Sequence, residues 1–142
     1  TRCSRDWSSD VCSSDLGTVE GVDLAEVSIK AARRALHDLR QVRVHVQDVD
    51  AWLIAPQARP DGIVLDPPRS GAGPRITRAI AETGARRIVY VACDAVALGR
   101  DARILLERGY SLAALRAFDA FPMTHHFETV ALFTLTGSGQ LP

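Results

Sequence analysis

Acidic side chains and one thiol stand at the ends of four short apolar segments of this chain. Asp23 and Asp66 each end such a segment, Asp48 closely follows another, and Cys93 ends the fourth. Open α/β sheets bind ligands beyond the carboxyl ends of their strands, and in dinucleotide-type folds an acid after the second strand commonly takes ribose hydroxyls. Three such acids in succession favour a nucleotide-like ligand. The alternative is that each aspartate caps a helix or a turn.

Two prolines and an arginine follow the third of these segments, in the string DPPRSGAG. Pro67 and Pro68 predict a rigid, extended exit from a strand with few backbone donors, and such a wall can hold a planar base. Arg69 then projects from it with a guanidinium that suits a phosphate or a base edge. The alternative is a strand stopped by prolines with a solvated arginine, which the string as a whole disfavours.

Cys93 is a candidate nucleophile, because a helix is predicted to begin shortly after it. A thiol next to a helix N-terminus is more nucleophilic than usual, since its thiolate form is stabilised there. The alternative is a small buried hydrophobic residue, which is the commoner fate of a free cysteine. A Cys–His protease dyad is disfavoured, because the chain has no oxyanion or specificity signature.

Polar residues also precede the last apolar segment, in the string FDAFPMTHHFETV. Glu128 comes directly before that segment, and His125 and His126 precede Glu128. A metal site made by the two histidines with Asp119 is disfavoured, because adjacent histidines rarely both face one ion. No metal site is therefore predicted.

These candidates need a framework of strands and helices to position them. Apolar or β-branched segments predict strands at 19–23, 42–46, 62–66, 87–93, 110–118 and 128–136. Helical spacing of apolar residues predicts helices at 25–39, 76–83 and 95–108, with an irregular connection and a short helical turn within 51–60. This alternation predicts an α/β fold with a mostly parallel sheet, whose continuous apolar strands are buried.

The composition indicates one globular domain or part of one. The chain has 142 residues, of which 46% are hydrophobic and 24% charged, and its net charge is zero. This composition is typical of a folded protein and not of a disordered one. The chain also lacks the net positive charge that would indicate nucleic-acid binding. No run approaches the ~18 apolar residues that a membrane span needs, and no signal peptide is evident.

Residues 1–16 do not resemble a folded protein, because they show neither helical nor strand periodicity. Asp6–Leu16 resembles one translated frame of a common sequencing adaptor; the alternative is a disordered polar N-terminus. We expect 1–16 to be an artefact that stands where a Gly-rich turn should approach the ligand. Without it Cys93 is the one cysteine left, which fits a reducing, cytoplasmic location.

The chain closely resembles the RNA (uracil-5-)-methyltransferase family, which makes 5-methyluridine in tRNA or rRNA, in DPPRSGAG, RIVYVACD, ARILLERGY and FDAFPMTHHFETVALF. The resemblance covers Val19–Leu135. It implies an α/β, Rossmann-like fold of the class I S-adenosylmethionine-dependent methyltransferases, truncated before its second strand. Residues 17–136 are then the C-terminal part of the catalytic domain, and 137–142 are a tail. Amino-group methyltransferases have an aromatic residue after a similar Pro-Pro motif, whereas Arg69 follows here.

The resemblance implies a role for each candidate residue. Cys93 matches the family nucleophile and Glu128 the family base. The implied cofactor contacts are Asp23, Asp48 and Asp66, and the implied substrate contacts are Pro67, Pro68 and Arg69. The chain departs from the family at Asp23, where glutamate is commoner, and at Ala95, where proline is usual.

The resemblance therefore predicts transfer of a methyl group from S-adenosylmethionine to C5 of a uridine in tRNA or rRNA. The expected partner is RNA, and the expected protein is a cytoplasmic monomer without a membrane partner. We expect the 142-residue chain alone to be inactive. We also expect this part of the protein not to contain the binding site of the iron–sulfur cluster that some relatives carry. The alternative from another class is a non-catalytic RNA-binding module with the same fold, in which Cys93 has no chemical role.

Overall fold

The computed structural model of the protein describes residues 17–55, 59–119 and 127–136. The chain divides into two compact units, Thr1–Trp52 and Leu53–Pro142, each with its own sheet. The expectations for 1–16 and 137–142 lie outside the described residues, as do His125 and His126. Within the described part, no helix is both long and apolar enough to cross a membrane.

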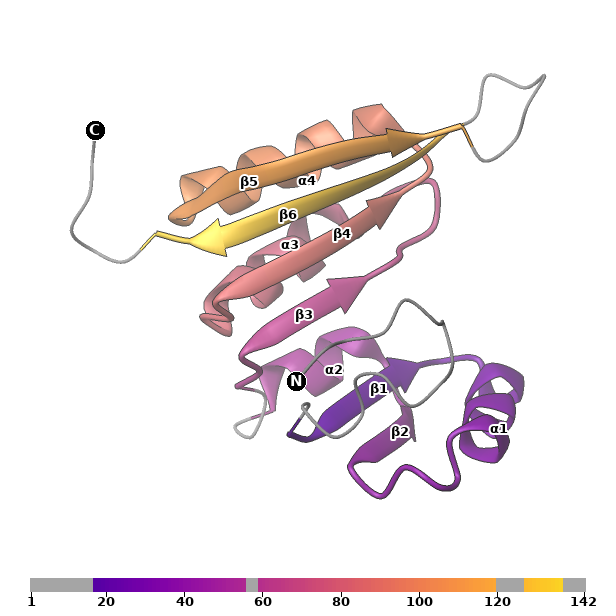
Figure 1. Ribbon diagram of the computed structural model, residues 1–142. Helices are drawn as coiled ribbons and strands as arrows, with labels where there is room; N and C mark the ends of the chain where they lie inside the picture. The colour runs from indigo at the N-terminus through magenta and orange to yellow at the C-terminus, as the bar shows by residue number, and fades with distance from the viewer. Residues whose placement is uncertain (1–16, 56–58, 120–126, 137–142) are drawn as a thin grey trace, which may run out of the picture. The chain divides into compact units, whose positions relative to one another are not determined.

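The first unit holds a parallel pair of strands joined through a helix (Figure 1). Its elements are β1 (Val19–Asp23), α1 (Glu26–Ala35) and β2 (Val42–Val46), and α2 (Val49–Ile54) crosses into the second unit. Both strands have the predicted bounds, and they pair one to one along their whole length. Because the strands are parallel, their carboxyl ends lie at the same edge of the pair.

Helix α1 is shorter than predicted and turns a different face inward. A spacing of four from Val27 to Leu39 predicted a helix up to residue 39, but the helix gives way to a turn in which the N–H of Leu39 donates to the carbonyl of Leu36 at 3.0 Å. Val27, on the predicted apolar stripe, is 81% exposed, whereas Ile29 is buried. Within the described part of this unit, Ile29 is the one buried residue.

The second unit holds a four-stranded mixed sheet in the order β3-β4-β6-β5 (Figure 1). Its strands are β3 (Gly62–Leu65), β4 (Arg87–Ala92), β5 (Tyr110–Phe118) and β6 (Glu128–Leu135). The predicted strands are confirmed to within one residue, and β3, β4 and β5 run in the same direction, while β6 runs antiparallel between β4 and β5. The nine residues between β5 and β6 are too few for the helical crossover that parallel strands need.

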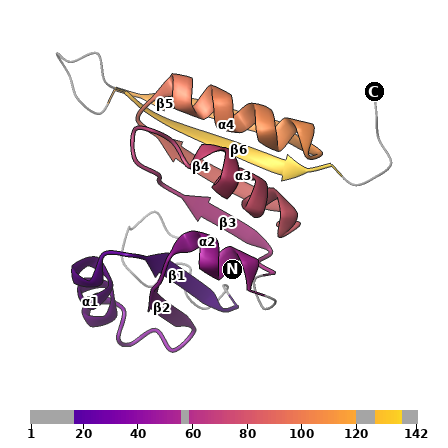
Figure 2. The same cartoon turned by 180° about the vertical axis from the view of Figure 1, so that it is seen from behind.

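Two helices of this unit cover one face of the sheet, as Figures 1 and 2 show from opposite sides. They are α3 (Gly73–Glu82) and α4 (Ala95–Glu107). Apolar side chains such as Ile80 of α3 pack against inward-facing side chains of the sheet, among them Tyr90 of β4 and Phe133 of β6. This contact forms the hydrophobic core of the unit.

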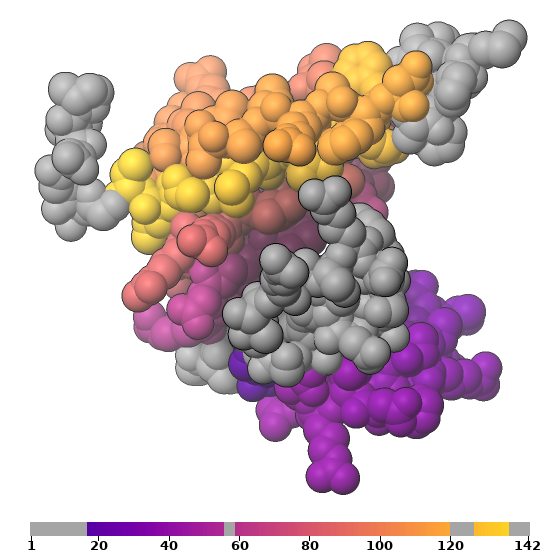
Figure 3. Space-filling model, viewed as in Figure 1, coloured from indigo at the N-terminus to yellow at the C-terminus, as the bar shows by residue number. Residues whose placement is uncertain are grey.

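The opposite face of the sheet, which we call the open face, is less buried in the described residues. Along β4, buried Ile88 and Tyr90 alternate with partly exposed Val89 and Val91. Figure 3 shows side chains of β5 and β6 at the molecular surface on the open face. The burial on both sides that the apolar run predicted for β4 is therefore not found, because the helices of this unit pack on one side only.

Candidate active site

The two predicted catalytic residues lie at the ends of two neighbouring strands. β4 and β6 pair one to one up to Ala92↔Thr129. Cys93 stands in the bend directly after β4, and Glu128 is the first residue of β6. Because the two strands are antiparallel, the end of β4 and the start of β6 lie at the same edge of the sheet. The thiol and the carboxylate therefore both stand at that edge.

Both residues are half-buried, and the pleat of β6 assigns Glu128 to the open face. Ala92 and Thr129, the last pair of the ladder, are 5% and 6% exposed. Because successive side chains of a strand point to opposite faces, Glu128 points away from the core. Cys93 follows the last residue of β4 in a bend and is half-buried there.

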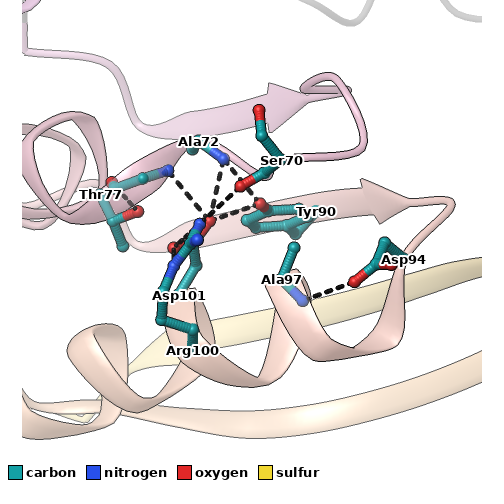
Figure 4. Close-up of polar contacts among 9 residues, drawn as sticks. Ser70, Ala72, Thr77, Tyr90, Asp94, Ala97, Arg100 and Asp101 are labelled. Atoms are coloured by element: carbon teal, nitrogen blue, oxygen red, sulfur yellow. Dashed lines mark hydrogen bonds and ion pairs between the residues drawn. The ribbon is translucent and has the colours of Figure 1, made fainter.

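The turn after Cys93 is closed by a helix cap. Asp94 has an extended backbone, and its Oδ1 accepts a hydrogen bond from the N–H of Ala97 at 2.7 Å (Figure 4). Helix α4 begins at Ala95, so the departure from the family's usual proline leaves this turn formed. Cys93 thus precedes the N-terminal end of a 13-residue helix, where the helix dipole favours negative charge.

The loop after β3 carries the predicted contacts Asp66, Pro67, Pro68 and Arg69. The N–H of Gly71 donates to the carbonyl of Pro68 at 2.8 Å, which closes a β-turn with Arg69 at its second position. Asp66, Pro68 and Arg69 are exposed, and Pro67 is half-buried. Because β3 and β4 are parallel neighbours, this loop leaves the sheet at the edge that also carries the two predicted catalytic residues.

Asp23 and Asp48 stand in the first unit, at the carboxyl ends of β1 and β2, and both are exposed. Oδ1 of Asp23 accepts a hydrogen bond from the N–H of Ala25 at 2.8 Å. Oδ1 of Asp48 accepts from the N–H groups of Asp50 and Ala51 at 2.9 and 3.3 Å, which caps α2. The capping alternative is therefore confirmed for both. Contact with a cofactor stays a prediction, and each carboxylate has a second oxygen that could serve it.

One buried carboxylate, Asp101 in the middle of α4, was not among the predicted site residues (Figure 4). It is 0% exposed. Its Oδ2 accepts hydrogen bonds from the Tyr90 hydroxyl at 2.7 Å and from the N–H groups of Ala72 and Gly73 at 2.9 and 3.2 Å. Its Oδ1 accepts from Nε and Nη2 of Arg100 at 2.9 and 2.8 Å. Five donors therefore compensate the burial of this charge.

Tyr90 stays protonated in this cluster and so remains a hydrogen-bond donor. Burial and, next, the hydrogen bond to Asp101 raise the pKa of its hydroxyl well above the usual value.

The sequence does contain a signal for the buried position of Asp101. Asp101 lies three residues after Leu98 and four before Leu105, which are both buried, so it occupies the apolar stripe of the helix. A charged residue at core spacing must find buried partners.

Cys93 is a free thiol in the part of the chain that the structure describes. Across the same residues, no group of three or more His, Cys, Asp or Glu side chains is arranged to hold a metal ion. The disfavoured metal site of Asp119 with His125 and His126 includes residues outside that part and so is not tested.

Known proteins with similar sequences point to one family. Residues 11–135 match the family described as tRNA (uracil-5-)-methyltransferase. A curated protein of Bifidobacterium longum, described as an uncharacterized RNA methyltransferase, is 48% identical over 122 residues, which are 82% of this chain and 27% of that protein. A Thermotoga maritima protein with the same description is 42% identical over 113 residues, or 78% of this chain and 26% of that protein. The chain thus spans less than a third of the length of these relatives.

Solved structures give the same picture. The tRNA (uracil-54, C5)-methyltransferase of Pyrococcus abyssi, solved with S-adenosyl-L-homocysteine, has a TM-score of 0.71 and 30% identity, covering 82% of this chain and 29% of that chain. Fibrillarin of Aeropyrum pernix, solved with S-adenosyl-L-methionine, has a TM-score of 0.61 and 15% identity, covering 81% of this chain and 55% of that chain, and informs on the fold alone. The predicted fold, that of class I S-adenosylmethionine-dependent methyltransferases, is confirmed.

Proposed function

Because this chain belongs to the tRNA (uracil-5-)-methyltransferase family, we propose that the whole protein methylates C5 of a uridine in tRNA or rRNA. The observation that carries the proposal is the antiparallel pairing of β4 and β6, because Cys93 follows the end of β4 and Glu128 begins β6 at the same edge of the sheet. C5 methylation needs a nucleophile and a base at adjacent atoms of one ring. A thiol and a carboxylate at this edge suit that requirement.

Cys93 acts as the nucleophile in this proposal. C5 of uracil is by itself a poor nucleophile. When the Cys93 thiolate adds to C6, the electron pair of the C5–C6 double bond moves toward C5 and O4, and C5 becomes enolate-like. S-adenosylmethionine, when bound, supplies an electrophilic methyl group to which C5 can bond. The position of Cys93 directly after β4, where the thiol is free and half-buried, supports this role.

Glu128 then acts as the general base. Its carboxylate takes the proton from C5, the electron pair of the broken C–H bond re-forms the C5–C6 double bond, and the Cys93 thiolate leaves C6. Proton removal at C5 follows addition at the neighbouring C6, so base and nucleophile must stand side by side. The target uridine must also leave its stack, since the reaction needs access to the ring.

The acidic residues suit S-adenosylmethionine, because carboxylates accept hydrogen bonds from ribose hydroxyls. Asp23 and Asp48 are exposed at the shared carboxyl edge of β1 and β2, and we assign them to the ribose and to the adenine end. Asp66 stands after β3, where it would separate the cofactor from the target base. Arg69, exposed at its turn, offers a guanidinium to RNA, beside the proline wall.

Covalent trapping on RNA that contains 5-fluorouridine tests the proposal. Fluorine at C5 cannot be removed as a proton, so the adduct between Cys93 and C6 should persist after methyl transfer. We expect the whole protein to form a denaturant-resistant adduct that depends on S-adenosylmethionine, and Cys93→Ala to form none. Val96→Ala, an exposed change in the first turn of α4, should still form it. RNA binding without an adduct or methylation would instead favour the non-catalytic module.

A second arm of the same experiment uses ordinary RNA and tests the base. Glu128→Gln keeps the size of the side chain but cannot accept the C5 proton. The methylated adduct should therefore accumulate in this variant without fluorine. Rapid turnover with no adduct would assign the base to another residue.

We further propose that the 142-residue chain alone does not turn over. Its strands form two separate sheets, and it spans only 27% of the B. longum relative. Calorimetry with S-adenosylmethionine should detect no tight binding to this chain. Binding as tight as that of the whole protein would contradict the expectation.

A further inference from the structure

Asp101 is a buried charged residue that the proposed reaction does not use. Three of its five donors belong to other segments of the chain, and two of these are the backbone N–H groups of Ala72 and Gly73. Those two groups end the loop after β3 and begin α3. The buried carboxylate therefore binds the backbone of the loop that carries Arg69.

The N-terminus of α3 has no cap of its own. Ala72 stands at the N-cap and offers no side-chain acceptor, and Pro74, the second helical residue, has no backbone N–H that would need a partner. Asp101 accepts instead from the N–H groups of Ala72 and Gly73, which have no acceptor within α3 and lie 29 and 28 residues away in sequence. A carboxylate here also complements the positive end of the helix dipole. Asp101 thus supplies the missing cap from the neighbouring helix.

Arg100 extends the same contact to the other side of the loop (Figure 4). Its Nη2 binds Oδ1 of Asp101 at 2.8 Å and donates to the carbonyl of Ser70, also at 2.8 Å. Ser70 directly follows Arg69 in the β-turn. The loop is therefore held at Ser70, Ala72 and Gly73, immediately after the exposed guanidinium.

Gly71 shows how closely the loop lies against this cluster. Its φ is +77°, in the left-handed region that favours glycine. A Cβ atom added at Gly71 would lie 2.6 Å from Nη2 of Arg100 and 2.6 Å from Oδ2 of Asp101. Glycine at this position lets the backbone approach the carboxylate.

We propose that Asp101, together with Tyr90 and Arg100, is a positioning group that holds the turn after β3 so that Arg69 faces RNA. This inference rests on the proposed function and adds residues to the same site. The hydrogen bonds from Asp101 and Arg100 to this loop are called the tether from here on. Asp66 directly follows a paired strand and does not depend on the tether. Loosening the tether should therefore raise KM for RNA and leave kcat nearly unchanged.

Two tyrosines provide a matched test. Tyr90→Phe removes the hydroxyl that donates to Asp101 and accepts from the N–H of Ala72 at 3.0 Å, whereas Tyr110→Phe removes a buried hydroxyl that donates to the carbonyl of Ala85 at 2.8 Å. We expect Tyr90→Phe to raise KM for RNA about fivefold or more, since the loss of one hydrogen bond alone predicts about fivefold. Tyr110→Phe should leave KM unchanged. An equal KM in both variants would overturn the proposal.

Two arginines of α4 provide a second matched pair. Arg100→Ala removes the hydrogen bond to Ser70 and the ion pair with Asp101, whereas Arg103→Ala removes an exposed ion pair with Glu107. KM for RNA should rise in Arg100→Ala and stay unchanged in Arg103→Ala. A rise of the same size in Arg103→Ala would assign the effect to net charge and overturn the proposal.

A measurement without RNA separates this inference from the proposed function. Amide hydrogen exchange at Ala72 and Gly73 should become faster in Tyr90→Phe and in Asp101→Asn, and should keep its original rate in Tyr110→Phe. Unchanged exchange at these two amides would overturn the tether whether or not the protein methylates RNA. If exchange changes but the wild-type protein forms no adduct on 5-fluorouridine RNA, the proposed function fails and the tether stands.

Discussion

In the second unit, four strands and two helices enclose a continuous core, whereas in the described part of the first unit two strands and one helix bury Ile29 alone. Both units present predicted site residues at the carboxyl ends of parallel strands. Cys93 follows β4, whose Ile88 and Tyr90 are 0% and 1% exposed. Asp23 ends β1, in which no residue is buried. Polar residues at the carboxyl ends of strands are thus supported by a buried core in the second unit and by little buried structure in the first.

The difference follows from how much apolar surface each unit can enclose. A sheet is independently stable with three or more strands and a hydrophobic face, or with a helix packed on it. The first unit has two strands, and Leu24 and Val27, next to and within its helix, remain 66% and 81% exposed. We therefore expect it to open at a lower free energy than the second unit. The proposed catalytic pair rests on the more stable unit, and two proposed cofactor contacts rest on the less stable one.

The largest effect that tests this contrast comes from truncating a core residue of each unit. Phe133→Ala removes a fully buried ring from β6 and should lower the free energy of unfolding of the second unit by about 3–5 kcal/mol. Ile29→Ala is the matched change in the first unit, and its cost should remain within that unit. Hydrogen exchange of the 142-residue chain, followed by mass spectrometry, reports each strand separately.

In the unmodified chain the amides of β1 and β2 should already exchange faster than those of β4 and β6. Ile29→Ala should speed up the first pair further and leave the second pair protected. Equal protection of all four strands, or loss of protection in β4 after Ile29→Ala, would mean that the units unfold together.

Local patterns predicted most of the fold, because strand and helix propensities are read from neighbouring residues. The bounds of β1, β2 and β5 agree with the prediction. The start of α3 at Gly73 was missed, since its cap is Asp101, which lies 28 residues later. The face of α1 was also missed, because its apolar stripe at Val27 does not show which side will be covered.

The candidate site was predictable in its residue types but not in its arrangement. The role of Glu128 follows from a family resemblance that spans nearly all of the chain outside its first residues, whereas the place of Cys93 before a predicted helix already makes it a candidate nucleophile. Their places at one edge of the sheet depend on β6 entering the sheet between β4 and β5, a long-range pairing that no local period encodes. Asp101 had a local signal, a charge at core spacing, but its partners in the loop could be found only in three dimensions.

Raising the pH above about 10 should produce the next largest difference in stability between the two units, because both tyrosines of the chain lie in the second unit. Burial raises the pKa of the Tyr90 and Tyr110 hydroxyls, and for Tyr90 the hydrogen bond to Asp101 raises it further. Above pH ~10 the unfolded chain loses phenolic protons that the folded unit keeps. Stability should therefore be unaffected by these groups below pH ~10 and fall above it, by up to about 1.4 kcal/mol per pH unit for each tyrosine.

Urea unfolding at a series of alkaline pH values measures this slope, and ultraviolet absorbance reports ionisation of the phenols. Tyr110→Phe should reduce the slope by removing one of the two groups, and it leaves the Asp101 cluster intact. Phenols that ionise near pH ~10 while the second unit stays folded would contradict the prediction.

Removing helix caps should give the smallest effect and the most local one. Asp94 caps α4, which contributes Leu98 and Leu105 to the core, whereas Asp48 caps α2, a six-residue helix in which no residue is buried. Asp94→Ala should lower the unfolding free energy of the second unit by about 1 kcal/mol, as cap removal usually does. Asp48→Ala removes the same kind of hydrogen bond but should speed hydrogen exchange in α2 alone.

Asparagine at either position retains a capping oxygen and serves as the control. Equal losses of global stability in the two alanine variants would show that α2 is coupled to the core as strongly as α4, and the proposed difference between the units would then be wrong.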